Sequence, residues 1–161
     1  MNRTHFVRLL AASFALAAIA CSPSSNAQQR TGAIVLEDPW SAATPSGASV
    51  AAGYVTIRNT GATAERLLSA STPRANRTEV HEMSMDNGVM RMRPLQFISI
   101  PAGGAVTFAP GGTHIMFTDI DAPFTEGATI PVTLRFERQG EVQATFIVRA
   151  RGSHGAHTHE H

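Results

Sequence analysis

Short runs of residues that alternate between apolar and polar occupy the chain from about residue 32 to residue 150. Glycine, proline and asparagine separate these runs, which cover 50–59, 78–85, 89–93, 114–120, 129–138 and 141–150. No stretch of ten or more residues in this region has a convincing helical period. Many short strands with frequent turn signals and no intervening helix predict an all-β fold, an antiparallel sandwich or Greek-key barrel.

The last two runs predict a long hairpin that turns around Gln139 and Gly140. Apolar residues alternate along both strands, and the two apolar sets share one face only if the loop has an odd number of residues. The larger aromatic side chains are expected in the core of the fold: Trp40, Tyr54, Phe108, Phe117 and Phe146.

The N-terminus has the charged-then-apolar order of an export signal. Arg3 and Arg8 precede an apolar run at residues 9–20, which is too short for a permanent membrane span. Two cleavage sites fit: before Cys21, where the preceding residues resemble a lipobox and Cys21 would carry a lipid, or after Ala27. We expect a signal peptide at 1–20, a flexible tether at 21–31 and a folded domain at 32–151. The domain is therefore expected in the periplasm, with a lipid on Cys21 as its only membrane attachment.

Composition excludes several classes of function. Cys21 is the single cysteine, so the chain has neither an intramolecular disulfide framework nor a Cys-x-x-Cys site. Loss of the first 20 residues leaves 11 basic and 12 acidic residues, which gives no basic excess for binding nucleic acid. The chain also lacks nucleophile and phosphate-loop motifs, so we expect no enzyme.

The Asn87-Gly88 pair predicts a tight type I′ hairpin turn between two strand-like runs. With those two as the loop, Met85 lies opposite Met90 and Met83 lies opposite Met92. Directly opposed residues share a face with residues two positions away. One face of the hairpin therefore carries His81 and four methionines, and the other carries Glu82, Ser84, Arg91 and Arg93.

His114 and Met116 are also two apart on a predicted strand, so their side chains point the same way. All methionines after Met1, and the only two histidines of the domain, lie between residues 81 and 116. Taken singly, each of these methionines is better explained as core filler, because methionine packs well into irregular gaps. As a set, thioethers and imidazoles suit Cu(I), and the domain lacks the cysteine that a blue-copper electron carrier needs. The site forms only if the fold brings the two segments together.

The pattern His81-x10-Met92-x21-His114-x-Met116 resembles the signature of the PCuAC family of periplasmic copper chaperones. The resemblance covers residues 34–150 and implies a cupredoxin-like β-barrel whose Cu(I) ligands are His81, Met92, His114 and Met116. It also implies delivery of copper towards the CuA centre of cytochrome c oxidase, by way of an oxidase subunit or a Sco-type thiol protein. We expect a monomer. Glu82 stands where the family often has methionine, which makes Met83 a candidate spare ligand.

Residues 152–161 form a polar tail whose imidazoles are candidate ligands for a second, Cu(II) site: His154, His157, His159 and His161. A solvated tail without a metal fits the same residues. The sequence also fits two other functions. One is copper buffering for resistance, and the other is a structural β-sandwich whose methionines only fill the core.

Overall fold

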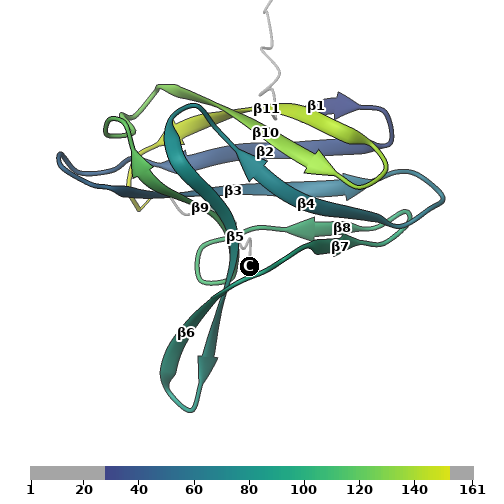
Figure 1. The fold of residues 1–161 in the computed structure, drawn as a ribbon, viewed down its shortest axis with the longest axis horizontal. Coiled ribbons are helices and arrows are strands. Elements are labelled where there is room, and N and C mark those ends of the chain that lie inside the picture. The colour runs from purple at the N-terminus through teal and green to yellow at the C-terminus, as the bar shows by residue number, and fades with distance from the viewer. Residues whose placement is uncertain (1–27, 153–161) are drawn as a thin grey trace, which may run out of the picture.

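The computed structural model of the chain describes residues 28–152, which form eleven strands (Figure 1). The strands are β1 (Gln28–Thr31), β2 (Ile34–Ala42), β3 (Val50–Asn59), β4 (Glu65–Ser71), β5 (Ala75–Asp86), β6 (Val89–Pro94), β7 (Ile98–Ile100), β8 (Ala105–Thr107), β9 (Thr113–Ile120), β10 (Thr129–Phe136) and β11 (Gly140–Arg149). This part of the chain contains no helix capable of crossing a membrane. The expected signal peptide, Cys21 and the tail histidines His154, His157, His159 and His161 lie outside the described residues.

The strands form one open sheet in the order β6-β5-β9-β3-β2-β11-β10-β4-β7, with β1 paired to β2 and β8 paired to β3. The predicted all-β, cupredoxin-like fold is confirmed. One pairing departs from the antiparallel expectation, because β11 runs parallel to β2, with Ile147 opposite Trp40. This neighbour of β2 comes from the far end of the chain, so no hairpin signal in the sequence could indicate it.

The core is built from one face of each long strand. Alternation buries the apolar set while the residues between them face outward. The largest fully buried side chains include Phe117, Phe124, Phe136, Phe146, Ile57 and Leu134. Val132 lies opposite Ala144 across the β10–β11 hairpin, and Phe136 lies opposite Gly140. Three residues lie between Phe136 and Gly140, so the loop has an odd number of residues, as predicted.

Two of the predicted core aromatics lie elsewhere. Phe108, Phe117 and Phe146 are buried, but Trp40 and Tyr54 are half-buried and stack on each other with ring centroids 4.5 Å apart. Tyr54 alternates with Gly53 and Val55, which face the core. It therefore lies on the outer face of β3, and Trp40, its cross-strand partner on β2, shares that face.

The folded part begins before residue 32. Residues 28–31 form β1, which pairs with the first residues of β2, although the sequence places them in the tether. Edge pairing of this kind uses backbone groups, so a polar segment without alternation gives no sequence signal for it.

A buried carboxylate fastens the β10–β11 loop to β4. Glu65 is 5% exposed and accepts hydrogen bonds from the backbone N–H groups of Arg66 (2.8 Å), Arg138 (3.1 Å) and Gln139 (2.9 Å). Burial alone would raise the pKa of Glu65, but these three N–H groups outweigh it and lower that pKa. The charged form of Glu65 is thus part of the folded structure.

The β5–β6 hairpin projects from the body of the domain (Figure 1). Asn87 and Gly88 have φ values of 49° and 80°, the positive values that a type I′ turn requires. Met85 lies opposite Met90 and Met83 lies opposite Met92, so the predicted register is confirmed. The β9 partners of β5 end at Glu82, and beyond that point β6 is the only paired strand.

Candidate metal centre

The two domain histidines meet across neighbouring strands. His81 of β5 is the direct partner of His114 of β9, and their ring centroids are 6.0 Å apart. Val80 and Ile115, the chain neighbours, are buried in the core. Alternation therefore turns both imidazoles outward onto one face, which Met116 and its cross-strand partner Glu79 share. The two segments that carry the candidate ligands therefore lie side by side, as a shared metal site needs.

A single carbonyl fixes the orientation of His114. The imidazole is 5% exposed, and its Nδ1 lies 3.0 Å from the carbonyl oxygen of Gly112. A carbonyl only accepts, so Nδ1 donates this hydrogen bond, and Nε2 is the nitrogen that can bind a metal. The same oxygen accepts the backbone N–H of Met83 at 3.2 Å. Gly112 thus orients the His114 ring and holds the base of the hairpin at the same point.

His81 has one nitrogen with a partner and one without. Its Nε2 lies 3.4 Å from Oε2 of Glu79. Its Nδ1 is buried and is the only such side-chain nitrogen or oxygen without a hydrogen-bond partner in residues 28–152. Buried polar atoms normally find a partner, and a bound metal ion is one way to supply it. The carboxylate, imidazole and open nitrogen follow the arrangement in which an outer carboxylate orients a metal-binding histidine.

Three methionines help to line a pocket beside the two rings. The pocket has a volume of about 320 Å³, and Met83, Met92, His114 and Met116 all contribute to its wall. His81 is not part of this wall and lies next to it through His114. The structure therefore gathers three of the four sequence-predicted ligands and Met83 around one cavity, with the fourth adjacent. Met85 and Met90 lie outside it and are 67% and 61% exposed.

The far wall of the pocket comes from elements that the ligand motif does not include. Tyr54, residues 42–45 and Arg151 also line the pocket. Burial raises the pKa of Tyr54, so its phenol stays neutral beside the methionines. The sequence motif singled out neither Tyr54 nor Glu79. Glu79 lies two residues before His81, so strand alternation was a signal that could have placed it on the ligand face.

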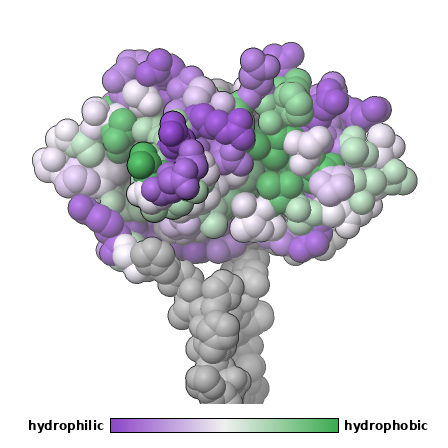
Figure 2. Space-filling model, turned by 90° about the horizontal axis from the view of Figure 1, so that it is seen from below, coloured by the Kyte–Doolittle hydropathy of each residue, from purple (hydrophilic) through white to green (hydrophobic). Residues whose placement is uncertain are grey.

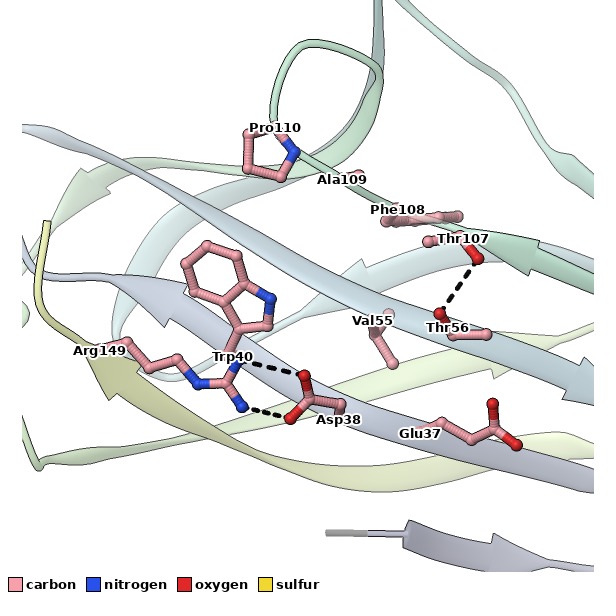
Figure 3. A pocket seen from close by; sticks show the side chains of 10 residues that line it. All are labelled: Glu37, Asp38, Trp40, Val55, Thr56, Thr107, Phe108, Ala109, Pro110 and Arg149. Atoms are coloured by element: carbon pink, nitrogen blue, oxygen red, sulfur yellow. Dashed lines mark hydrogen bonds and ion pairs between the residues drawn. The ribbon is translucent and has the colours of Figure 1, made fainter. Parts of the chain in front are cut away.

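A second, larger pocket of about 490 Å³ lies between β2, β3 and β8 (Figure 3). Its polar groups have partners: Arg149 pairs with Asp38 and lies over the Trp40 ring, the hydroxyls of Thr56 and Thr107 are 3.1 Å apart, and Glu37 pairs with Arg58. No histidine, methionine or cysteine lines it. A soft metal ion therefore has its donors at the smaller pocket.

The fold and this face of imidazoles and thioethers define the class of protein. The domain superposes on the copper-bound PCuAC domain of PmoF2 with a TM-score of 0.66 and 28% identity, covering 76% of this chain and 97% of that one. It also matches the Cu(I)-bound solution structure of DR1885 from Deinococcus radiodurans, with a TM-score of 0.53 and 27% identity over 69% of this chain and 74% of that one. The PCuAC assignment made from the sequence is confirmed.

The chain belongs to the LpqE-like family, described as "Putative lipoprotein LpqE-like", whose model matches residues 34–148. A putative lipoprotein of Leifsonia xyli subsp. xyli is 35% identical over 92 residues, which cover 56% of this chain. That match spans 55% of the Leifsonia protein, about half of its length. An uncharacterized protein of Rickettsia prowazekii (strain Madrid E) is 26% identical over 74% of this chain and 68% of its own length.

Proposed function

We propose that this protein is an exported Cu(I) chaperone whose ion is held by His81, Met92, His114 and Met116. The observation that carries the proposal is the direct pairing of His81 with His114 beside a pocket walled by Met92 and Met116. Two imidazoles and two thioethers are soft, neutral donors, a set that suits Cu(I). The copper-bound PmoF2 and DR1885 domains support the choice of metal.

The same ligands suit transfer of the ion. Neutral thioethers hold Cu(I) less tightly than thiolates, and they do not form disulfides in an oxidising compartment. We propose delivery towards the CuA centre of cytochrome c oxidase, to an oxidase subunit or a Sco-type thiol protein, by a monomer in the periplasm. The protein binds and releases its cargo and catalyses no reaction.

Met83 is the candidate spare ligand. It lies directly opposite Met92 and contributes to the same pocket wall. A thioether in this position can replace a ligand that is leaving or arriving while copper moves in or out. Because His81 is not in the wall of the pocket, Met83 is also a candidate for holding the ion before His81 engages it.

The ends of the chain supply two further parts of the proposal. Arg151, which precedes the histidine-rich tail in the sequence, lines the same pocket as Met92, His114 and Met116. We propose that His154, His157, His159 and His161 collect Cu(II) separately. Truncation after Gly152 should remove Cu(II) binding and leave Cu(I) binding intact, and equal loss of both would contradict two sites. Lipidation of Cys21, which the LpqE-like family name supports, would anchor the domain at a membrane.

Replacement of a histidine tests the binding function. The wild-type protein should compete with bicinchoninate for Cu(I), and His114→Ala should lose this ability. If the protein is only a structural sandwich, the substitution should not change the competition. Circular dichroism of the variant checks that the fold survives, because His114 is buried. Val89→Ala, at the exposed tip of the hairpin, is a control that should leave the competition unchanged.

The phenotype of a deletion strain separates delivery from buffering. Loss of oxidase activity that appears only at low copper supports delivery. Sensitivity that appears only at high copper supports buffering and contradicts delivery.

A further inference from the structure

The methionines of the hairpin continue beyond the pocket as a ladder of two rungs. Met83 and Met92 form the inner rung at the pocket, and Met85 and Met90 form the outer rung, one step nearer the tip. Residues two apart on a strand lie about 7 Å from each other on the same face. The ladder therefore leads from solvent towards the imidazoles in steps that a long, flexible thioether side chain can cover.

Both rungs occupy the cross-strand positions at which side chains come closest. The backbone N–H of Met83 donates to Gly112, away from β6, so Met83 and Met92 are a non-hydrogen-bonded pair. Pairs alternate along an antiparallel ribbon, so Met85 and Met90, two positions further on, are also of this kind. The Cα atoms of such pairs are about 4.5 Å apart, which brings two thioethers within reach of one ion.

Packing does not account for the outer rung. Met85 and Met90 are 67% and 61% exposed, and the sheet gives this end of β5 no partner except β6. Ion pairs join the two strands on the opposite face of the ribbon: Arg91 with Asp86 at 3.2 Å and Arg93 with Glu82 at 2.9 Å. The view from the hairpin side shows polar and apolar surface next to each other (Figure 2). The exposed thioethers therefore lie on a ribbon whose cross-strand contacts do not depend on them.

We propose that Met85 and Met90 form a second, weaker site for a soft monovalent cation, at which Cu(I) binds before it moves inward along the ladder. The inference rests on the proposed function, because the ladder ends at the His81–His114 pocket. No redox step is involved: Cu(I) remains Cu(I) and exchanges one thioether for the next. Two thioethers without imidazole bind less tightly than the inner set, which directs the ion towards the pocket.

Methyl NMR with Ag(I), a redox-inert soft cation, tests the site directly in the full chain labelled at the methionine methyl groups. The methyls of Met92 and Met116 should shift with the first equivalent, and those of Met85 and Met90 should shift as more is added. If Met92 and Met116 shift while Met85 and Met90 stay fixed, the second site is refuted and the chaperone site stands. If none of the four shifts, both are refuted.

Two variants separate the second site from other roles of the ribbon. In His114→Ala the shifts of Met85 and Met90 should persist, because the outer rung does not include the imidazole. Met85→Leu/Met90→Leu keeps the apolar surface but removes both sulfur atoms, and should slow Cu(I) loading from a bicinchoninate complex. Val89→Ala, an equally exposed apolar change on the other face, should load at the wild-type rate. If the leucine variant also loads at that rate and only an added protein perturbs Met85 and Met90, the ribbon is a docking surface and the proposal is wrong.

Discussion

Removal of the Glu79 carboxylate should weaken Cu(I) binding without touching a ligand. Oε2 of Glu79 lies 3.4 Å from Nε2 of His81, and Nδ1 of the same ring is buried without a partner. A carboxylate that accepts a hydrogen bond from the Nε2–H group fixes the ring orientation and makes Nδ1 a better donor to the metal. Glu79→Ala removes the acceptor, whereas Glu79→Gln keeps an acceptor oxygen and loses only the charge.

The structure sets the size of this effect. Loss of an outer-shell partner typically costs about 10–100-fold in metal affinity. The contact here is long, the Glu79 side chain is 40% exposed, and Arg77 shares the same oxygen at 3.6 Å. We therefore expect the lower end for Glu79→Ala, about tenfold or about 1.4 kcal/mol, and a smaller loss for Glu79→Gln.

Competition with bicinchoninate at pH 7 measures the change, and Glu82→Gln is the matched control. Glu82 is the chain neighbour of His81, but it pairs with Arg93 on the opposite face of the ribbon. It contributes a similar negative charge without contact to the imidazole. Equal losses for Glu79→Gln and Glu82→Gln would mean that general charge, and not orientation of the ring, is responsible. No loss for Glu79→Ala would refute the reasoning.

Four other substitutions have defined outcomes. Met92→Leu should lower Cu(I) affinity by at least about tenfold, and Met83→Leu should lower it by less, as measured by the same bicinchoninate competition. The reverse order would mean that Met83 is the ligand and Met92 the spare one. Glu65→Gln should destabilise the fold by about 2 kcal/mol at pH 7, because it leaves a backbone N–H without its acceptor. Because the fold lowers the pKa of Glu65, the free energy of unfolding of the wild type should fall as the pH drops below the ordinary pKa of glutamate. Urea unfolding of Glu65→Gln should not show this pH-dependent decrease. Gly53→Ala would place a Cβ 2.8 Å from Phe117 and should destabilise the domain by about 1–3 kcal/mol in the same assay; an unchanged midpoint would contradict that packing.

Local chemistry allowed the turn and the register of the β5–β6 hairpin to be predicted. The Asn87-Gly88 turn fixes which residues face each other, and strand alternation then places every methionine of the ribbon on one face. The odd β10–β11 loop followed in the same way from two alternating apolar sets that must share a core. In both cases the determining residues are near neighbours in the sequence.

Long-range pairings were not accessible in this way. His81 and His114 are partners because β9 lies against β5, and only the family resemblance pointed to that pairing from the sequence. The parallel β2–β11 pair and the backbone-only strand β1 leave no local pattern. Trp40 and Tyr54 resemble core residues by type, yet alternation on β3 places Tyr54 outside, and pairing with Tyr54 places Trp40 on the same outer face. Glu79 was missed because no motif includes it, although its spacing from His81 implied a shared face.

X-ray absorption of the Cu(I)-loaded domain tests the central claim most directly, because it counts the atoms bound to the ion. We predict two nitrogen neighbours, from His81 and His114, and two sulfur neighbours, from Met92 and Met116. His114→Ala should then show one nitrogen fewer. A spectrum with sulfur neighbours alone, or with oxygen in place of sulfur, would contradict the proposed site.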